Sequence, residues 1–311
     1  MPKILITTSS FNLPASTSLA RLQKDGFQIV VNPHGRKLTE NEVGALLDPE
    51  VVGLIAGTEP LTRSVLSGAR NLKVLSRCGI GMDNVDVAAA RELGIQVFNT
   101  PDAPTAAVAE LTLGLMLDAL RGISYADREI RAGTWKARMG GLLGARTVGI
   151  VGYGRIGRRV ARLAHAFGSR ILATDVAPLE ADGVAEICAL EHLLAESDIV
   201  SLHLPSQKDR GCFLDASRIA AMKRNAVLVN TARGDLVDEE ALILALQEGR
   251  LAGAALDTFA KEPYSGGLAA LPQVVLTAHM ASYAAESRLT MEREAADNLV
   301  KGLAAGGFLA A

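Results

Sequence analysis

Short runs of aliphatic and β-branched residues alternate with amphipathic segments along almost the whole chain. In the first third, the apolar runs predict strands at Lys3–Thr7, Gln28–Val31, Val51–Ile55, Val74–Ser76 and Gln96–Phe98. Helices are expected between them, including Ser18–Lys24 and Thr39–Leu47, and the second opens with the capping-box spacing of Thr39 and Glu42. Strands separated by helices indicate βαβ units and therefore a parallel sheet.

A second series of alternating runs begins near residue 147. Its predicted strands are Thr147–Val151, Arg170–Thr174, Ile199–Leu202, Val227–Asn230, Ala254–Leu256 and Val274–Leu276. Between the two series, Thr105–Arg121 is apolar on nearly all sides, which predicts a long helix buried within the chain or against a second subunit. Asp238 and Gly249 are a typical helix start and stop, and Ala284–Ala304 predicts a last amphipathic helix.

Length and composition limit the function classes. A chain of 311 residues is long enough for two domains, and its 49% hydrophobic and 21% charged residues are typical of a globular protein. Lys and Arg number 32 against 34 Asp and Glu, without a basic stripe, which argues against a nucleic-acid partner. Apolar runs are too short for a membrane span or a signal peptide, so no membrane partner is expected.

The cysteines Cys78, Cys188 and Cys212 lie far apart in the sequence, and no C-x-x-C or Cys/His cluster is present. We therefore expect neither a metal site nor a disulfide framework, and a reducing compartment, the cytoplasm, fits this pattern.

The strand Thr147–Val151 runs into a G-x-G-x-x-G loop, and a helix is expected from about Arg158 to Phe167. Gly152 would permit the tight turn, Gly154 would let the backbone approach a pyrophosphate, and Gly157 would let the helix pack on the strand. The helix N-terminus would add N–H groups and a positive dipole for the phosphates. The motif in this context predicts dinucleotide binding.

Asp175 ends the next predicted strand, where a carboxylate accepts hydrogen bonds from an adenosine ribose. It would repel a 2′-phosphate, and the following Val176, Ala177 and Pro178 supply no arginine to neutralise one. NAD is therefore favoured over NADP.

Three further polar residues are expected at the carboxyl ends of strands or in loops of the same domain, where α/β proteins bind ligands. Arg233 and His279 each follow a strand, and Glu262 lies in the loop between them. His203 also ends a strand and fits packing as well as cofactor binding. The other histidines, His34, His165 and His192, are expected at the surface.

Together these segments resemble the D-isomer-specific 2-hydroxyacid dehydrogenases over nearly the whole chain. The motifs that carry the resemblance are, in chain order, Arg77-Cys-Gly79-Ile-Gly81-Met-Asp83-Asn84-Val-Asp86, Ala109-Glu110, Gly152-Tyr-Gly154-Arg-Ile-Gly157, Asn230-Thr-Ala-Arg233-Gly234, Asp257 with Glu262-Pro263, and Thr277-Ala278-His279.

The resemblance implies an α/β protein of two doubly wound parallel-sheet domains. Residues 1–99 and 283–311 would form a flavodoxin-like substrate domain, and residues 100–282 an inserted Rossmann domain that binds NAD. The helix Thr105–Arg121 would then lie in the interface of a homodimer or of a dimer of dimers.

The resemblance also implies roles. His279 would exchange the proton of the substrate hydroxyl, Glu262 would hold the imidazole and favour its protonated form, and Arg233 would clamp the substrate carboxylate. Cofactor contacts are implied for Gly152, Gly154, Arg155, Ile156, Gly157, Asp175, His203, Pro205, Thr231, Ala232, Arg233, Asp257, His279, Ala281 and Ser282. Substrate contacts are implied for Arg77, Cys78, Gly79, Ile80, Gly81, Arg233 and His279, with Arg77 near a distal anionic group.

Among the family's branches, Arg77 and the Asp83–Asp86 segment look most like 3-phosphoglycerate dehydrogenases. However, Ala56 stands where many of those enzymes have a phosphate-binding arginine, and Ala278 replaces a common proline. The sequence thus predicts an NAD-dependent enzyme that interconverts a small D-2-hydroxy acid and its 2-oxo acid, with 3-phosphoglycerate as one candidate. The alternatives are a glyoxylate or hydroxypyruvate reductase and, from another class, an NAD-sensing scaffold of the co-repressor type.

Overall fold

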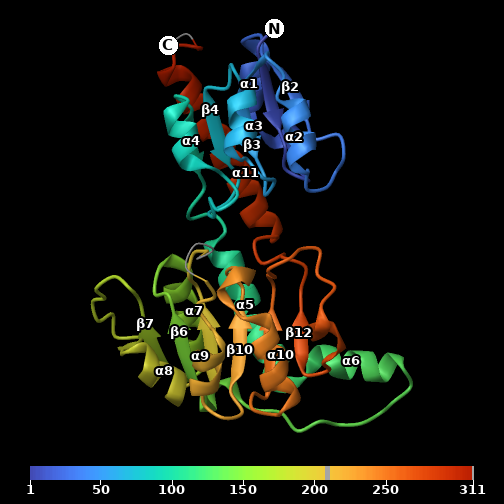
Figure 1. Cartoon of the computed structure of the whole chain (residues 1–311), viewed down its shortest axis with the longest axis vertical. Coiled ribbons are helices and arrows are strands. Elements are labelled where there is room, and N and C mark those ends of the chain that lie inside the picture. The colour runs from blue at the N-terminus through green and yellow to red at the C-terminus, as the bar shows by residue number, and fades with distance from the viewer. Residues whose placement is uncertain (207–210, 310–311) are drawn as a thin grey trace. The chain divides into compact units, whose positions relative to one another are not determined.

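The computed structural model describes residues 1–206 and 211–309, and the chain divides into two compact units (Figure 1). Unit 1 comprises Met1–Pro104 and Ala284–Ala311, and unit 2 comprises Thr105–Tyr283. Unit 1 is therefore discontinuous in sequence. Across the described residues, none of the helices has both the length and the apolar character needed to cross a membrane.

Unit 1 contains a five-stranded parallel sheet in the order β2-β1-β3-β4-β5. The strands are β1 (Lys3–Ile6), β2 (Gln28–Val31), β3 (Val51–Ala56), β4 (Val74–Arg77) and β5 (Gln96–Asn99). All five predicted strands are confirmed, with ends that move by no more than one residue. This order is that of flavodoxin-like sheets, as the fold-class prediction expected.

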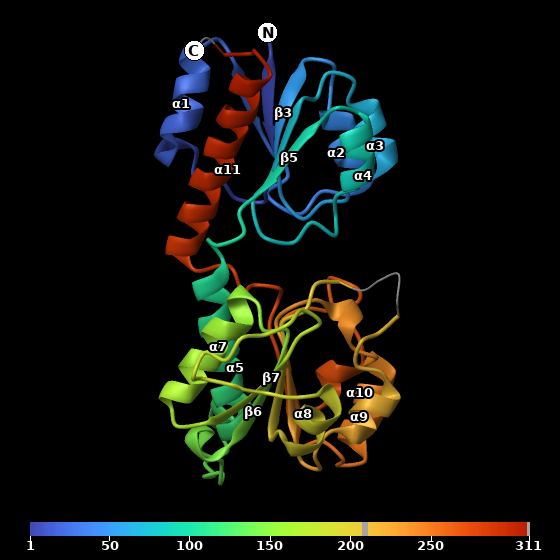
Figure 2. The same cartoon turned by 90° about the vertical axis from the view of Figure 1, so that its left-hand side faces the viewer.

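Helices cover both faces of this sheet, and Figure 2 shows the two layers. They are η1 (Leu13–Ala15), α1 (Thr17–Lys24), α2 (Glu40–Leu46), α3 (Arg63–Gly68), α4 (Val87–Glu92) and α11 (Ala285–Ala305). Ile4 and Ile6 of β1 pack with α1 and α11, whereas Leu5 between them packs on the other face with α2, α3 and α4. This alternation is the two-residue period of a strand that is buried on both sides. The last helix of the chain thus completes the core of its first domain.

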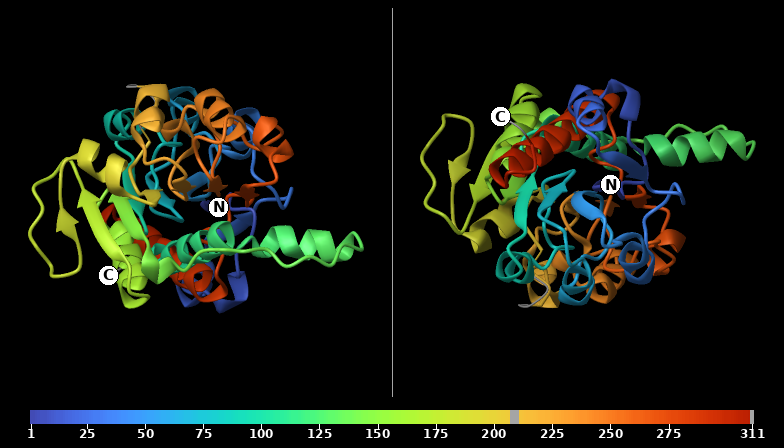
Figure 3. Two further views of the ribbon diagram at one scale, coloured as in Figure 1. Left: turned by 90° about the horizontal axis from the view of Figure 1, so that it is seen from below. Right: turned by 90° about the horizontal axis from the view of Figure 1, so that it is seen from above.

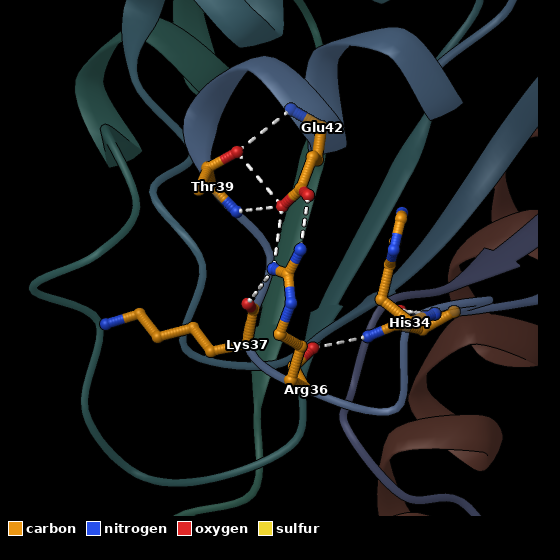
Figure 4. Close-up of polar contacts among 6 residues, drawn as sticks. His34, Arg36, Lys37, Thr39 and Glu42 are labelled. Carbon is orange, nitrogen blue, oxygen red and sulfur yellow. Dashed lines mark hydrogen bonds and ion pairs between the residues drawn. The ribbon is translucent and has the colours of Figure 1, made fainter. Parts of the chain in front are cut away.

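The predicted capping box at the start of α2 is confirmed (Figure 4). The Thr39 hydroxyl accepts a hydrogen bond from the Glu42 N–H at 3.3 Å, and the Glu42 carboxylate accepts one from the Thr39 N–H at 2.8 Å. Arg36 donates to both carboxylate oxygens of Glu42, at 2.9 and 2.6 Å. The hydrogen bonds from Arg36 and then Thr39 lower the pKa of Glu42. These contacts fix the loop that follows β2.

Unit 2 contains a seven-stranded parallel sheet in the order β12-β11-β10-β9-β6-β7-β8. The strands are β6 (Thr147–Val151), β7 (Arg170–Thr174), β8 (Glu186–Ile187), β9 (Ile199–Leu202), β10 (Val227–Asn230), β11 (Gly253–Leu256) and β12 (Val274–Leu276). The six predicted strands are confirmed, and β8 is an additional short edge strand. From β6 the sheet extends in both directions, through β7 and β8 on one side and through β9 to β12 on the other, as in a Rossmann fold.

Helices cover both faces of this sheet too. The helices of unit 2 are α5 (Thr105–Arg121), α6 (Ile123–Arg131), η2 (Leu143–Ala145), α7 (Arg155–Ala166), α8 (Leu190–Glu196), α9 (Ala216–Ala221), η4 (Gly234–Leu236), α10 (Glu239–Gln247) and η5 (Gly267–Ala270), of which α6 contributes no buried residue. Residues of α5 and α7 share one core with the sheet, and residues of α8, α9 and α10 share the other. Helix α7 begins at Arg155, within the glycine motif, three residues earlier than predicted.

The long predicted helix is confirmed as α5, with the predicted ends. Its buried side chains include Ala109, Thr112, Leu115 and Met116, and the apolar ones among these pack into the core that α7 and the sheet share. The structure thus selects burial within the chain for this face of the helix.

Candidate active site

The predicted polar residues of unit 2 collect along one edge of its sheet. Because all strand pairs are parallel, their carboxyl ends lie on the same side. The residues that follow these ends are Gly152 after β6, Asp175 after β7, His203 after β9, Arg233 after β10, Asp257 after β11 and His279 after β12. The edge runs from the glycine loop to the candidate catalytic residues.

His279 and Glu262 form a pair at this edge. The two carboxylate oxygens of Glu262 lie 3.0 and 2.9 Å from Nδ1 of His279. Because an ionised carboxylate only accepts hydrogen bonds, Nδ1 carries the proton and Nε2 is left to face a ligand. The imidazole side chain is 40% exposed and the Glu262 side chain 28% exposed, so the pair is accessible. This geometry suits a histidine that exchanges protons through Nε2.

The backbone of His279 has a positive φ of 50°, which is uncommon for a residue with a side chain. The fully buried Asp257 holds this turn. Its Oδ1 accepts hydrogen bonds from the Thr277 hydroxyl at 2.6 Å and the Met280 N–H at 2.9 Å, and its Oδ2 accepts from the Ala281 N–H at 2.9 Å. The His279 N–H donates to the Asp257 carbonyl at 2.8 Å. Asp257, predicted as a cofactor contact, thus has both carboxylate oxygens engaged with the histidine turn.

Arg233 lies in a turn whose conformation is determined by buried polar groups. Asn230 accepts from the Ala232 N–H at 3.0 Å and donates to the Arg233 carbonyl at 2.8 Å. The hydroxyl of Thr231 lies 2.8 Å from that of Thr112 on α5, and both residues are buried. The Arg233 side chain is half-buried, and its Nη1 donates to the Ala232 carbonyl at 2.7 Å. The sequence did not indicate a role for Thr112, because its partner Thr231 is far away in the sequence and comes close only in the folded chain.

The glycine loop has the shape that a pyrophosphate requires. Gly152 has a φ of 94°, and a Cβ there would lie 2.5 Å from the His203 carbonyl oxygen. A Cβ on Gly157 would overlap the Gly152 carbonyl, whereas one on Gly154 would meet nothing within 4 Å. Gly152 and Gly157 are therefore needed for close packing, and Gly154 faces open space at the start of α7, which Arg155 and Ile156 continue.

Asp175 is connected to the glycine loop. Its Oδ2 accepts a hydrogen bond from the Tyr153 N–H at 2.7 Å, and its Oδ1 accepts one from the Ala177 N–H at 3.1 Å. The carboxylate is half-buried, so it combines an anchoring role with access to a ligand.

His203 lies in a different environment from His279. Its Nε2 lies 2.9 Å from the hydroxyl of the buried Ser201, and burial lowers the pKa of His203 to about 4. The imidazole is therefore neutral at pH 7, although part of the residue reaches the surface. Of the other predicted cofactor contacts, Pro205 is exposed, Ser282 is half-buried and Ala281 is buried.

The predicted substrate segment Arg77–Gly81 belongs to unit 1 and begins at the last residue of β4. Arg77 is 8% exposed and its guanidinium donates to the Cys78 carbonyl, which places it against Gly79. The Gly79 N–H donates to the Thr100 hydroxyl at 2.8 Å. Among the described residues, the Ile80 and Gly81 N–H groups have no hydrogen-bond acceptor. Burial raises the pKa of the Cys78 thiol to about 11, so it stays protonated.

Comparison with known proteins gives consistent matches. Residues 113–281 match the sequence model of the D-isomer specific 2-hydroxyacid dehydrogenase NAD binding domain. The chain is 37% identical to a hydroxypyruvate reductase of Thermotoga maritima, over 91% of this chain and 96% of that protein. It is 39% identical to a D-3-phosphoglycerate dehydrogenase of Methanocaldococcus jannaschii over 86% of this chain, which spans about half of that protein (52%). The crystal structure of a glyoxylate reductase from Paecilomyes thermophila superposes with a TM-score of 0.87 at 30% identity, covering 99% and 97% of the two chains.

The environment of His203 predicts a specific loss of stability in acid. The pKa of this histidine in the folded protein lies below the value of about 6.5 expected for an unfolded chain, so the unfolded chain takes up the proton first as the pH falls. Between pH 7 and pH 5, this group alone should remove about 2 kcal/mol of the free energy of unfolding. Urea unfolding of wild type, His203→Gln and the exposed-site control His192→Gln over this range measures the effect. Only His203→Gln should lose less stability than wild type, and superimposable pH profiles for all three would contradict the assignment.

Proposed function

The chain belongs to the D-isomer-specific 2-hydroxyacid dehydrogenase family, and on this basis we propose that it reduces a small 2-oxo acid, with glyoxylate and hydroxypyruvate as first candidates. Enzymes of this family are oxidoreductases that act on a CH–OH group with NAD. The observation that carries the proposal is the contact of both Glu262 carboxylate oxygens with Nδ1 of His279, which leaves Nε2 for the substrate oxygen.

The chain's own residues fit an NAD cofactor. The open space at Gly154 and the N-terminus of α7 suit a pyrophosphate, and Asp175 suits the adenosine ribose. When bound, NAD supplies the hydride acceptor for oxidation of the hydroxy acid and, as NADH, the hydride donor for reduction. We extend the proposal to selectivity for NAD over NADP, because the Asp175 carboxylate would repel a 2′-phosphate.

His279 would give a proton from Nε2 to the substrate carbonyl oxygen during reduction and take it back during oxidation. Glu262 would keep Nδ1 protonated throughout and balance the positive charge of the imidazolium. Arg233 would bind the substrate carboxylate through its planar fork and polarise the neighbouring carbonyl. For the substrate loop of unit 1, taken by itself, we propose that the Ile80 and Gly81 N–H groups bind an anionic oxygen, because the Gly79 N–H is already used by Thr100.

The loop after β3 favours an acid without a phosphate. The strand ends in Ala56, and the loop carries the buried Glu59 in place of a cation. Glu59 accepts hydrogen bonds from the Thr7 hydroxyl and from the Gly57 N–H at 3.0 Å. Arg77, the candidate for a distal anion, is bonded to the Cys78 carbonyl. A dianionic phosphate would gain little from such a loop. 3-Phosphoglycerate remains the second candidate, supported by the Arg77 motif and by the Methanocaldococcus jannaschii relative.

The proposal predicts which 2-oxo acid and which cofactor the enzyme prefers. With NADH, kcat/KM for glyoxylate or hydroxypyruvate should exceed that for phosphohydroxypyruvate at least tenfold, or about 1.4 kcal/mol, and NADPH should support at most a tenth of the NADH rate. NADH absorbance measured across these acids checks both. The reverse substrate order would assign the chain to the phosphoglycerate branch. Binding of NADH without turnover of any acid would favour the scaffold alternative.

The catalytic pair predicts a separation of turnover from cofactor binding. His279→Ala should lower kcat by about 10²–10⁴, because it removes the proton donor, and Glu262→Gln should lower kcat by removing the partner charge. The affinity for NADH, measured by fluorescence titration, should stay within about twofold, and the exposed His192→Ala should change neither quantity. Near wild-type turnover in His279→Ala would refute the assignment.

We also propose that the enzyme is a cytoplasmic homodimer. The free thiols of all three cysteines are consistent with a reducing compartment. The dimer rests on α6 and residues 132–142, which project from unit 2 in Figure 3. Helix α6 has no buried residues, and Trp135, Met139 and Leu142 are 90%, 101% and 71% exposed. The Gly141 N–H bonds to the Leu120 carbonyl at 3.1 Å and anchors the returning chain at its base. We call α6 and residues 132–142 the arm. Large apolar side chains that are exposed on the arm need a partner surface.

The arm predicts a change of mass on substitution. Trp135→Asp combined with Met139→Asp should convert a particle with the mass of two chains into one with the mass of one chain, because charges on the arm disfavour burial. Light scattering during size-exclusion chromatography measures this. The control Leu244→Asp changes an equally apolar, 55% exposed position on α10 and should leave the mass unchanged. An unchanged mass in the double variant would place the interface elsewhere.

A further inference from the structure

Tyr153, the residue between the first two glycines of the loop, has a buried phenol, with 1% of the residue exposed. Its hydroxyl donates a hydrogen bond to Oδ2 of Asp182 at 3.0 Å. Its backbone N–H donates to Asp175 at 2.7 Å. A single residue of the glycine loop thus contacts both ends of residues 175–182, which follow β7.

Asp182 is the centre of a small network. Its Oδ1 accepts from the Val184 N–H at 3.0 Å, and Nη1 of Arg158 lies 3.3 Å from its Oδ2. The Arg158 guanidinium also lies over the Tyr153 ring, 4.6 Å from the centroid, within the range of a cation–π contact. Arg158 belongs to the second turn of α7, so the network connects the helix, the glycine loop and the segment after β7.

The protonation states agree with this network. Burial would by itself raise the pKa of Asp182, but the hydrogen bonds from Val184 and Tyr153 and the charge of Arg158 together lower it. Burial and the bond to Asp182 raise the pKa of Tyr153 to about 12. At neutral pH, a neutral phenol therefore donates to an ionised carboxylate, which is a stronger hydrogen bond than one between neutral groups.

The segment between these two contacts has little other support. Val176 is 95% exposed, and Ala177, Pro178, Glu180 and Ala181 are also exposed, whereas Leu179 is partly buried. The course of the segment therefore depends on its fixation at Asp175 and Asp182. The same segment borders Asp175, the residue proposed for the adenosine ribose.

We propose that Tyr153, Arg158 and Asp182 form a latch that fixes residues 175–182 as the wall of the site for the adenosine half of NAD. Asp182 and the Tyr153 hydroxyl are then positioning groups, which act through the segment and not by touching the nicotinamide end. This inference rests on the proposed NAD-dependent function and adds residues that the glycine motif does not include.

The latch is tested on the protein without substrate, with ADP-ribose and NADH as probes in calorimetric titrations. Tyr153→Phe removes the hydroxyl alone, and Asp182→Ala removes the carboxylate. Each should weaken ADP-ribose and NADH binding about tenfold, because a hydrogen bond to a charged group that orders the site is lost. The double variant should be no weaker than the worse single variant, and kcat at saturating NADH should stay within twofold.

Tyr264→Phe is the matched control. Its hydroxyl donates to Glu239, away from the glycine loop, so the variant removes a comparable bond from the same unit. It should bind ADP-ribose like wild type. If Tyr153→Phe and Asp182→Ala also bind ADP-ribose within twofold of wild type, the latch is refuted and the proposed reaction stands. If wild type itself binds neither probe, both the latch and the proposed function are refuted.

Discussion

The buried carboxylate of Asp257 is the interaction on which the geometry of the candidate active site depends. A carboxylate that is fully removed from water needs donors, and it finds them in Thr277, Met280 and Ala281. These donors surround His279, which adopts a positive φ that a side chain disfavours. The hydrogen bonds offset this cost and aim the imidazole at Glu262. The geometry of the His279–Glu262 pair thus depends on Asp257, which does not itself exchange the proton.

The parallel sheet explains why binding and chemistry share one edge. The glycine loop and Asp175 follow β6 and β7, on one side of the point where the strand order reverses, and the loops of Arg233, Glu262 and His279 follow strands on the other side. Each loop is held by polar groups of its own: the buried Asn230 for Arg233, the buried Asp257 for His279, and the partly buried Asp182 for the segment after β7. A change in one loop can therefore alter cofactor affinity or turnover separately.

Local sequence signals predicted most of the fold because local physics determines those elements. The apolar runs placed β6 and β7 correctly, and the spacing of Thr39 and Glu42 identified the start of α2. The two-residue strand β8 was not predicted, because Glu186 and Ile187 are both exposed and show no alternation of buried and exposed positions. The start of α7 was placed too late, since the glycine motif obscures a helix that begins inside it. For the site, the sequence singled out His279 and Glu262 but not Thr112 or Asp182, whose partners Thr231 and Tyr153 are distant in sequence and adjacent only after folding. It also did not single out Ser201, although the partner of Ser201, His203, lies only two residues further along the chain.

His203 and His279 show how environment assigns different tasks to one residue type. Both follow strands at the same edge of the sheet. His203 has a neutral hydroxyl as its partner and lies in surroundings that disfavour charge, so it stays neutral and packs its backbone against Gly152. His279 has a carboxylate partner on Nδ1, and its side chain is 40% exposed, which suits a histidine that exchanges protons with a ligand. An uncharged histidine beside the glycine loop adds no positive charge there, so attraction of the cofactor phosphates is left to the N–H groups of α7. The two histidines therefore differ in their partners and exposure, and the one with a carboxylate partner lies where the proton transfer is proposed.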